Sequence, residues 1–105
     1  MSQQMFDEQL VLAILLDQPR EHGWELGGLD ARWFTAPAHR KVAEAICAMR
    51  DLGQSVDYRR VARRVGRKGS ALYRFVHDLR NALGVPYGLT AAISRLQFTA
   101  ARRSA

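Results

Sequence analysis

Apolar side chains recur along this sequence at the spacing of α-helices, and no stretch keeps the two-residue alternation of a β-strand. Residues 10–16 are apolar at every position, which is typical of a helix that other helices surround. We therefore predict a first helix from about residue 4 to residue 17, at the centre of the hydrophobic core.

Interruptions of this pattern predict where the next elements begin and end. Pro19 and the glycines at 23, 27 and 28 predict an irregular connection with one short helical turn over about 24–29. Asp30 can cap a further short turn that reaches residue 34. Pro37 suits the first turn of the next helix, which should end at Gly53. The apolar stripe of that helix consists of Val42, Ala45, Ile46, Met49 and Leu52.

The second half of the chain predicts three more helices. Asp57 is the expected N-cap of a helix to about residue 65, and a loop follows at 66–69. Ser70 should cap a helix that ends near Gly84, and Pro86 should open a last helix that reaches about residue 102. The core stripes of these last two helices are Leu72, Phe75, Val76 and Leu79, and then Leu89, Ile93, Leu96 and Ala100.

These elements predict an all-α fold in which five or six helices form a single compact bundle. The 105 residues have room for one domain, with a globular head over 1–84 and a C-terminal helix over 85–102. The residues expected to be buried at its centre are Leu12, Leu15, Leu16, Ile46, Met49, Phe75 and Leu79.

The last helix carries a second apolar stripe, which lies opposite its core stripe and consists of Tyr87, Ala91 and Phe98. Exposed aromatic side chains at helical spacing suit an interface, so we predict that this face contacts a second copy or another protein. The alternative is that the N-terminal segment covers Phe98, through Met5 or Phe6.

Charge is distributed unevenly along the chain, whose formal net charge is +6. Residues 1–49 hold four basic and seven acidic side chains, whereas residues 50–80 hold nine basic and three acidic ones. Residues 81–105 add three arginines and no acid. Such asymmetry suits an anionic partner or head-to-tail contact between copies.

The helix that begins after Asp57 sorts its arginines onto one face, because apolar side chains occupy the other. With the loop that follows, this basic face comprises Arg59, Arg60, Arg63, Arg64, Arg67 and Lys68. Like charges at i and i+4 repel each other, so a neutralising anion would stabilise the helix. Nucleic-acid phosphates or an acidic protein surface could supply that anion, and a merely solvated face is the third interpretation.

Residues 57–76 also fit a helix-turn-helix pattern with Gly66 in the turn. Ser70, Ala71 and Arg74 would then face the major groove of DNA. A small DNA-binding regulator is therefore the alternative to a protein-interaction function.

The residues with catalytic potential do not form a recognisable set. His22, His39 and His77 lack the paired spacing of metal ligands, and we expect His39 to be a helix cap or a surface contact. The only cysteine, Cys47, lies beside a core stripe, and residues 66–70 have the wrong order for a phosphate-binding loop. We predict a non-enzymatic protein without metal or cofactor. The single cysteine and the lack of a membrane-spanning run indicate the cytoplasm and no membrane contact.

The chain as a whole resembles the N-terminal domain of DnaB-type replicative DNA helicases. The resemblance begins with residues 7–17 (DEQLVLAILLD) and continues with Phe34, His39 and Arg40 ahead of the next apolar stripe. It then follows residues 53–57 (GQSVD), residues 71–79 and the helix from Pro86. The concentration of arginines is unusual for that family.

This resemblance implies an all-α interaction module without catalytic residues. In the helicases the domain forms part of the collar of the hexamer and helps to engage primase, whose C-terminal domain has a similar fold. The implied function is helicase or primase assembly, or oligomerisation, in DNA replication. The implied partners are helicase and primase subunits or further copies, with weak nucleic-acid contact through the basic face.

Overall fold

The computed structural model describes residues 2–81 and 88–104, and within them it contains six α-helices, one 3-10 helix and no strand. The order of elements along the chain is α1 (Gln3–Asp17), α2 (Gly23–Gly27), η1 (Ala31–Trp33), α3 (Pro37–Asp51), α4 (Tyr58–Val65), α5 (Ala71–Asn81) and α6 (Leu89–Ser104). The prediction of an all-α bundle is confirmed. The predicted helix end near Gly84, the helix start at Pro86 and the position of Tyr87 lie outside the described residues.

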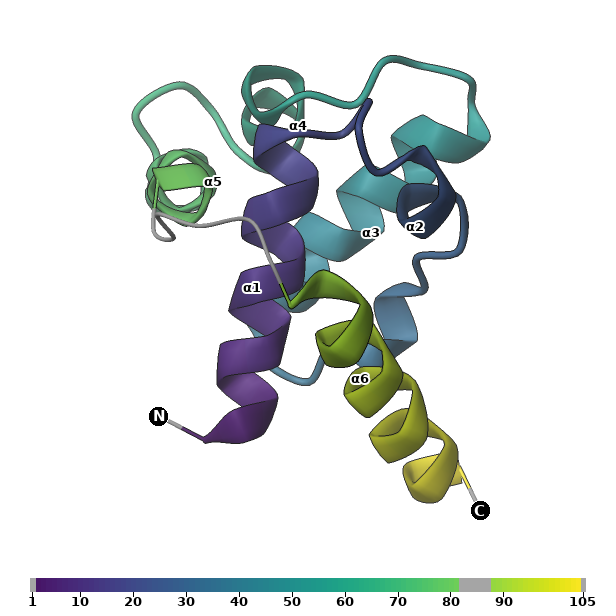
Figure 1. Cartoon of the computed structure of the whole chain (residues 1–105). Helices are drawn as coiled ribbons and strands as arrows, with labels where there is room; N and C mark the ends of the chain where they lie inside the picture. The colour runs from purple at the N-terminus through teal and green to yellow at the C-terminus, as the bar shows by residue number, and fades with distance from the viewer. Residues whose placement is uncertain (1, 82–87, 105) are drawn as a thin grey trace.

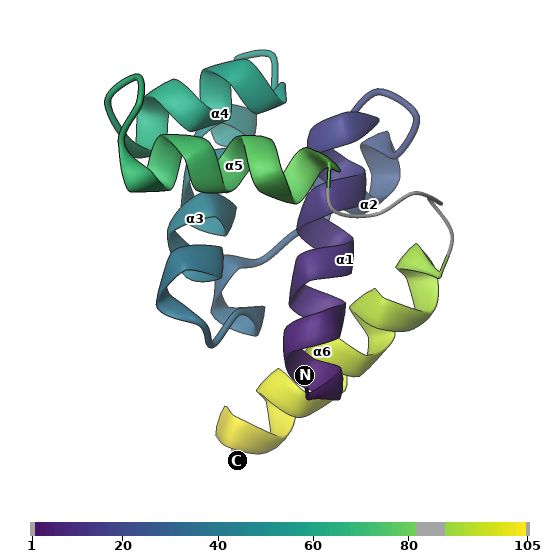
Figure 2. The ribbon, with the colours of Figure 1, turned by 90° about the vertical axis from the view of Figure 1, so that its left-hand side faces the viewer.

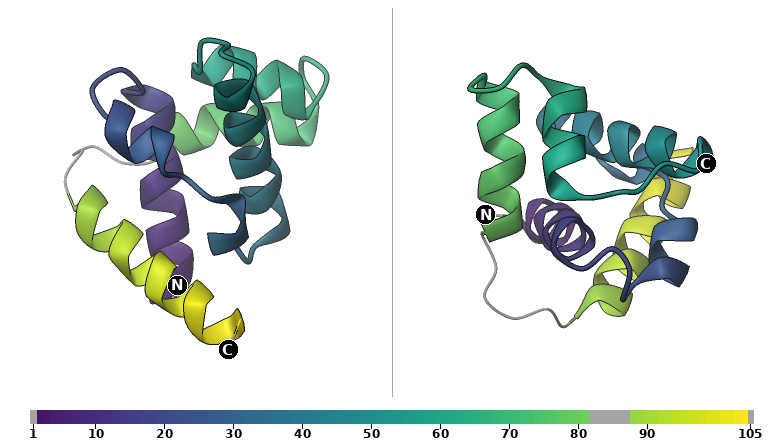
Figure 3. Two further views of the ribbon diagram at one scale, coloured as in Figure 1. Left: turned by 90° about the vertical axis from the view of Figure 1, so that its right-hand side faces the viewer. Right: turned by 90° about the horizontal axis from the view of Figure 1, so that it is seen from above.

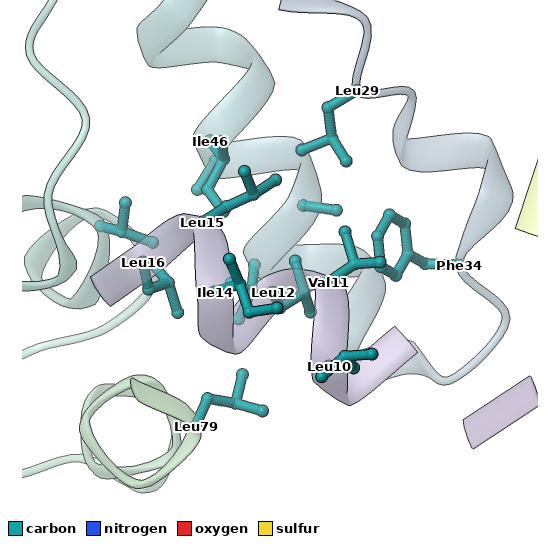
Figure 4. Packing of buried hydrophobic residues seen from close by; sticks show 14 of the residues in the cluster. Leu10, Val11, Leu12, Ile14, Leu15, Leu16, Leu29, Phe34, Ile46 and Leu79 are labelled. Atoms are coloured by element: carbon teal, nitrogen blue, oxygen red, sulfur yellow. The ribbon is translucent and has the colours of Figure 1, made fainter. Parts of the chain in front are cut away.

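Helix α1 forms the centre of the bundle, as the apolar run predicts. Every residue from 10 to 16 is buried, and Val11, Leu12 and Leu15 have no exposed surface at all. Helices α3, α5 and α6 pack around α1 on three sides (Figures 1 and 3). The close view in Figure 4 shows Leu15 beside Ile46 of α3, and Leu79 reaching towards α1 from α5.

The predicted caps form where the sequence places them. The side chain of Asp30 accepts a hydrogen bond from the backbone N–H of Arg32 at 2.9 Å, and η1 follows. Asp57 accepts from the N–H of Arg60 at 3.0 Å at the start of α4. Gly53 ends the turn after α3 with φ of +70°, in the left-handed region that suits a residue without a side chain.

Helices α4 and α5 form a hairpin and run side by side in opposite directions (Figures 2 and 3). Ser70 caps α5, since its Oγ accepts from the N–H of Tyr73 at 3.3 Å. A Cβ atom at Gly66 would lie 2.4 Å from this Oγ, so glycine allows the close approach that closes the hairpin.

Five predicted core positions are less buried than expected, and two of them, Leu72 and Ala100, are half-buried. Phe75 is half-buried and stacks on the ring of His39, with 5.6 Å between the ring centroids. Leu52 is 65% exposed, because α3 ends at Asp51 and the chain turns away at Gly53. On α6, Ile93 is only half-buried while Ala92 is fully buried. The small side chain of alanine allows α6 to lie close to α1.

Candidate functional site

Among the described residues, the most buried charged side chain is that of Glu8 on α1, with no exposed surface. Its carboxylate accepts hydrogen bonds from the hydroxyl of Thr35 at 2.7 Å and from the N–H groups of Thr35 at 3.0 Å and Ala36 at 3.2 Å. The side chain of Gln4 donates a further bond at 2.7 Å. Burial raises the pKa of this carboxyl, but the hydrogen bonds from His39, Gln4 and Thr35 outweigh burial and lower the pKa from 4.5 to about 2.

Glu8 fixes the segment that leads into α3, because its carboxylate accepts from the N–H groups of Thr35 and of Ala36, the residue at the N-cap position. His39 belongs to this contact as well: its Nδ1 lies 3.0 Å from Oε1 of Glu8, and its side chain is only 12% exposed. The prediction that His39 is a cap or a surface contact is therefore wrong. The imidazole is held by a carboxylate from another helix, and the cluster stabilises the fold.

A second buried carboxylate, Asp7, joins α6 to α1. Its oxygens accept from Nε of Arg95 at 2.8 Å and from Nη2 at 2.9 Å, which is the paired geometry that guanidinium and carboxylate groups favour. Gln3 donates a further hydrogen bond to the same carboxylate at 2.8 Å. The N-terminal half of α1 is thereby fastened to both α3 and α6 by acidic side chains.

Folding leaves the surface more basic than the composition alone suggests. All ten acidic residues lie in the described part of the chain, and six of them form ion pairs there. The acids without an ion pair in the described structure are Glu21, Glu25, Glu44 and Asp78. Eleven of the sixteen Lys and Arg residues make no ion pair within the same residues.

The predicted basic face is exposed, but the structure divides it into three parts. Arg59 lies over the ring of Tyr58, with 5.5 Å between its Cζ and the ring centroid, and its Nε donates to the Tyr58 hydroxyl at 3.2 Å. Arg60 pairs with Asp57 at 3.4 Å. Arg60 also belongs to the second part of the face, in which it lines a groove against α3 together with Arg63 and Arg64. The third part consists of Arg67 and Lys68, which lie in the exposed loop after α4.

The basic groove between α3 and α4 has a volume of about 510 Å³. One wall is formed by Gly53, Gln54 and Ser55, which follow α3, and the other by the three arginines. Met49, only 3% exposed, contributes an apolar surface to it. The sequence pattern predicted the arginines of this groove. It did not predict that the turn at Gly53 places a polar segment opposite them.

The arrangement of α4 and α5 gives little support to the helix-turn-helix alternative. In that motif the two helices cross steeply, at roughly 90–120°. Here they form an antiparallel hairpin (Figure 2). Of the three residues expected to face a major groove, Ala71 and Arg74 are exposed and Ser70 is half-buried as the cap of α5.

The outer stripe of α6 is exposed where it is described. Ala91 is exposed and Phe98 is 64% exposed, so neither Met5 nor Phe6 covers the phenyl ring. Phe98 forms one wall of a groove of about 390 Å³ between α1 and α6, whose other wall includes Gln3 and Gln4. The guanidinium Cζ of Arg102 lies 5.7 Å from the ring centroid. The structure thus gives this stripe a groove as well as an exposed ring.

The most exposed large apolar side chain is one that the sequence analysis did not select. Trp24 on α2 is 92% exposed. The acids Glu21 and Glu25 flank it in the sequence, and neither forms an ion pair. The clue in the sequence was the glycine on each side, since a five-residue helix between glycines has no neighbouring turn to cover a tryptophan.

The described residues contain no group of three or more His, Cys, Asp or Glu side chains that could hold a metal ion. Cys47 is half-buried, and burial raises the pKa of its thiol, which reduces its reactivity. Across residues 2–81 and 88–104, no helix combines the length and the apolar character needed to cross a membrane.

Comparison with known protein families, with curated proteins and with solved structures finds no match to this chain.

Proposed function

We propose that the chain is a non-enzymatic protein-interaction module of the replicative-helicase N-terminal type, which acts in helicase or primase assembly in DNA replication. The helicase assignment rests on the sequence resemblance alone. The observation that carries the interaction function is Phe98, an aromatic ring that is 64% exposed and forms the wall of the groove between α1 and α6. Exposed aromatic side chains beside a groove are the usual centres of protein interfaces.

The way α6 is held supports a docking role for this groove. Arg95 and Asp7 fix α6 against α1 by two hydrogen bonds, so the two walls keep their spacing before a partner arrives. A groove that needs no rearrangement saves the ordering cost of binding. The exposed ring of Phe98 then provides the apolar area that the partner would cover.

The experiment measures binding of the purified chain to a replicative helicase and to primase, with Phe98→Glu as the test variant. We expect the variant to bind its partner at least tenfold more weakly, because truncating a central aromatic anchor costs about 2 kcal/mol or more. Leu52→Glu is the matched control, because it also replaces an exposed apolar side chain by glutamate, at a leucine that is 65% exposed at the end of α3. Failure of the wild type to bind either partner, or equal loss in both variants, would reject the proposal.

The chain should also lack nucleotide hydrolysis, with or without DNA. Phosphoryl transfer requires residues that hold a triphosphate and Mg²⁺, and we assign neither role to any residue of the chain. Turnover that survives repurification and rises with protein concentration would identify an enzyme instead.

A DNA-binding regulator remains the second candidate, and one observation favours it: Arg63, Arg64 and Arg67 make no ion pair within the described structure. If they bind phosphates, affinity should fall steeply with salt, and Arg63→Ala with Arg64→Ala should lower the slope by about two. An interaction module should bind DNA weakly and lose it near physiological salt. Nanomolar, sequence-selective binding at ~150 mM salt would favour the regulator.

A further inference from the structure

Two surface features outside the groove at Phe98 carry opposite charges. The first is a knob formed by Trp24 and Glu25 on α2 together with Glu21, which shortly precedes the helix in the sequence. The second is the basic groove between α3 and α4, with Arg60, Arg63, Arg64 and Met49. We propose that the α2 knob of one copy docks into the α3–α4 groove of a second copy.

Hydrogen bonds from α3 hold the helix that carries the knob in place. Nη1 of Arg50 on α3 donates hydrogen bonds to the carbonyl oxygens of Leu26 at 3.1 Å and Leu29 at 2.6 Å, and it lies 3.4 Å from that of Gly27. The carbonyls of Leu26 and Gly27 belong to the end of α2 and that of Leu29 lies just beyond it, so a short helix that could not stand alone is fixed to α3. Trp24 therefore stays exposed because its helix is held in place, and not because its segment is loose.

The groove has the chemistry that an indole flanked by carboxylates requires. A guanidinium group stacks well on a tryptophan face, and three arginines line this groove. Arg63 and Arg64 make no ion pair within the described residues, so each is free to meet a carboxylate from the knob. The volume of about 510 Å³ falls within the usual size of a site that receives a bulky group.

Within this chain, the knob is the segment that best supplies these groups. The other acids without ion pairs, Glu44 and Asp78, lie on α3 and α5 and have no exposed aromatic side chain next to them in the sequence. The contact joins two different surfaces, so each copy has one knob and one groove to offer. A tryptophan buries only about 150–250 Å², and exposed charges are screened by salt, so we expect weak, salt-sensitive association.

The test is analytical ultracentrifugation at ~0.1–1 mM protein and low salt, a range suited to weak contacts, with a knob variant and a groove variant. Trp24→Ser removes the exposed ring, and the paired change Arg63→Glu, Arg64→Glu reverses the charge of the groove. We expect the wild type to associate and each variant to remain monomeric. An equimolar mixture of the two variants should again form dimers, because one variant keeps the groove and the other keeps the knob.

A matched control and a second measurement distinguish a specific contact in the groove from nonspecific electrostatic attraction. Arg67→Glu with Lys68→Glu makes the same charge change in the loop outside the groove, and it should leave association nearly unchanged. The tryptophan emission, to which the exposed Trp24 and the buried Trp33 both contribute, should shift to shorter wavelength as wild-type protein associates, and Trp24→Ser should abolish the shift. Circular dichroism should show all variants folded.

Several results would overturn the proposal: a wild type that stays monomeric, a mixture that does not dimerise, or a control that weakens association as much as the groove variant. Binding of an acidic peptide or an oligonucleotide to the groove, with Trp24→Ser associating normally, would assign the groove to that ligand instead. Phe98→Glu should not affect this association. Failure of the proposed function, which uses the groove between α1 and α6, can therefore be distinguished from failure of the proposed knob contact.

Discussion

The charged residues of α1 and α4 have opposite roles, although in each helix they are close together in the sequence. On α1, Asp7 and Glu8 are buried, and their carboxylates hold α6 and the start of α3 in place. On α4, Arg63 and Arg64 are exposed and make no ion pair within residues 2–81 and 88–104. Buried charges that are fully hydrogen-bonded fix a structure, whereas exposed like charges remain available for a partner.

The contrast predicts that substitutions on α1 should cost stability and substitutions on α4 should not. The largest effect is expected from Leu15→Ala, because Leu15 has no exposed surface and lies beside Ile46 at the centre of the core (Figure 4). The free energy of unfolding should fall by roughly 2–5 kcal/mol. Chemical denaturation measures it, and Leu52→Ala, at a leucine that is 65% exposed, should change it little.

The next largest effect is expected from Glu8→Gln. An amide has one acceptor oxygen, and its NH₂ group would replace either the oxygen that accepts from the N–H of Thr35 or the one that accepts from the N–H of Ala36, so one of these donors would lose its acceptor. Leaving buried donors without an acceptor costs roughly 1–3 kcal/mol. Denaturation of this variant should show the loss, and a matched Glu44→Gln change at an exposed glutamate of α3 should not.

The pH dependence of stability should reveal the same carboxylate. Its pKa is about 2 in the folded chain against an ordinary value of 4.5, so between these values the unfolded chain binds more protons. The stabilisation is therefore complete above about pH 4.5 and is lost as the pH falls towards 2. The difference between the two pKa values corresponds to a contribution of about 3 kcal/mol to the free energy of unfolding. Glu8→Gln should remove this acid-sensitive part, and an unchanged pH profile in the variant would contradict the assignment.

The same contrast explains what the sequence could predict. The apolar run at 10–16 and the caps at Asp30, Asp57 and Ser70 are local signals, and the helices follow them. Gln3 and Gln4 are local partners of Asp7 and Glu8, but the partners on other elements lie far along the chain, at Arg95 and at residues 35–39. No local pattern encodes such contacts.

The candidate sites divide in the same way. Helical periodicity was enough to place Arg63, Arg64 and Phe98 on outer faces. The grooves beside them depend on how α3 meets α4 and how α6 meets α1, which are tertiary contacts. The helix that carries Trp24 is fastened to α3 by hydrogen bonds from Arg50. These features required the structure because each joins segments that are separate in the sequence.

The smallest effect is expected on α4 itself. Replacing Arg63 and Arg64 by alanine removes no ion pair of the described structure and relieves like-charge repulsion between Arg60 and Arg64, one turn apart. Alanine also has the highest helix propensity. The free energy of unfolding should stay within about 0.5 kcal/mol of the wild type or rise slightly, and any rise should shrink as salt screens the repulsion. Denaturation at low and high salt measures both, with Arg95→Ala as the control, because removing the partner of the buried Asp7 should destabilise the chain at either salt concentration. A loss of stability above about 1 kcal/mol in the double alanine variant would show that these arginines hold the fold, as the acids of α1 do.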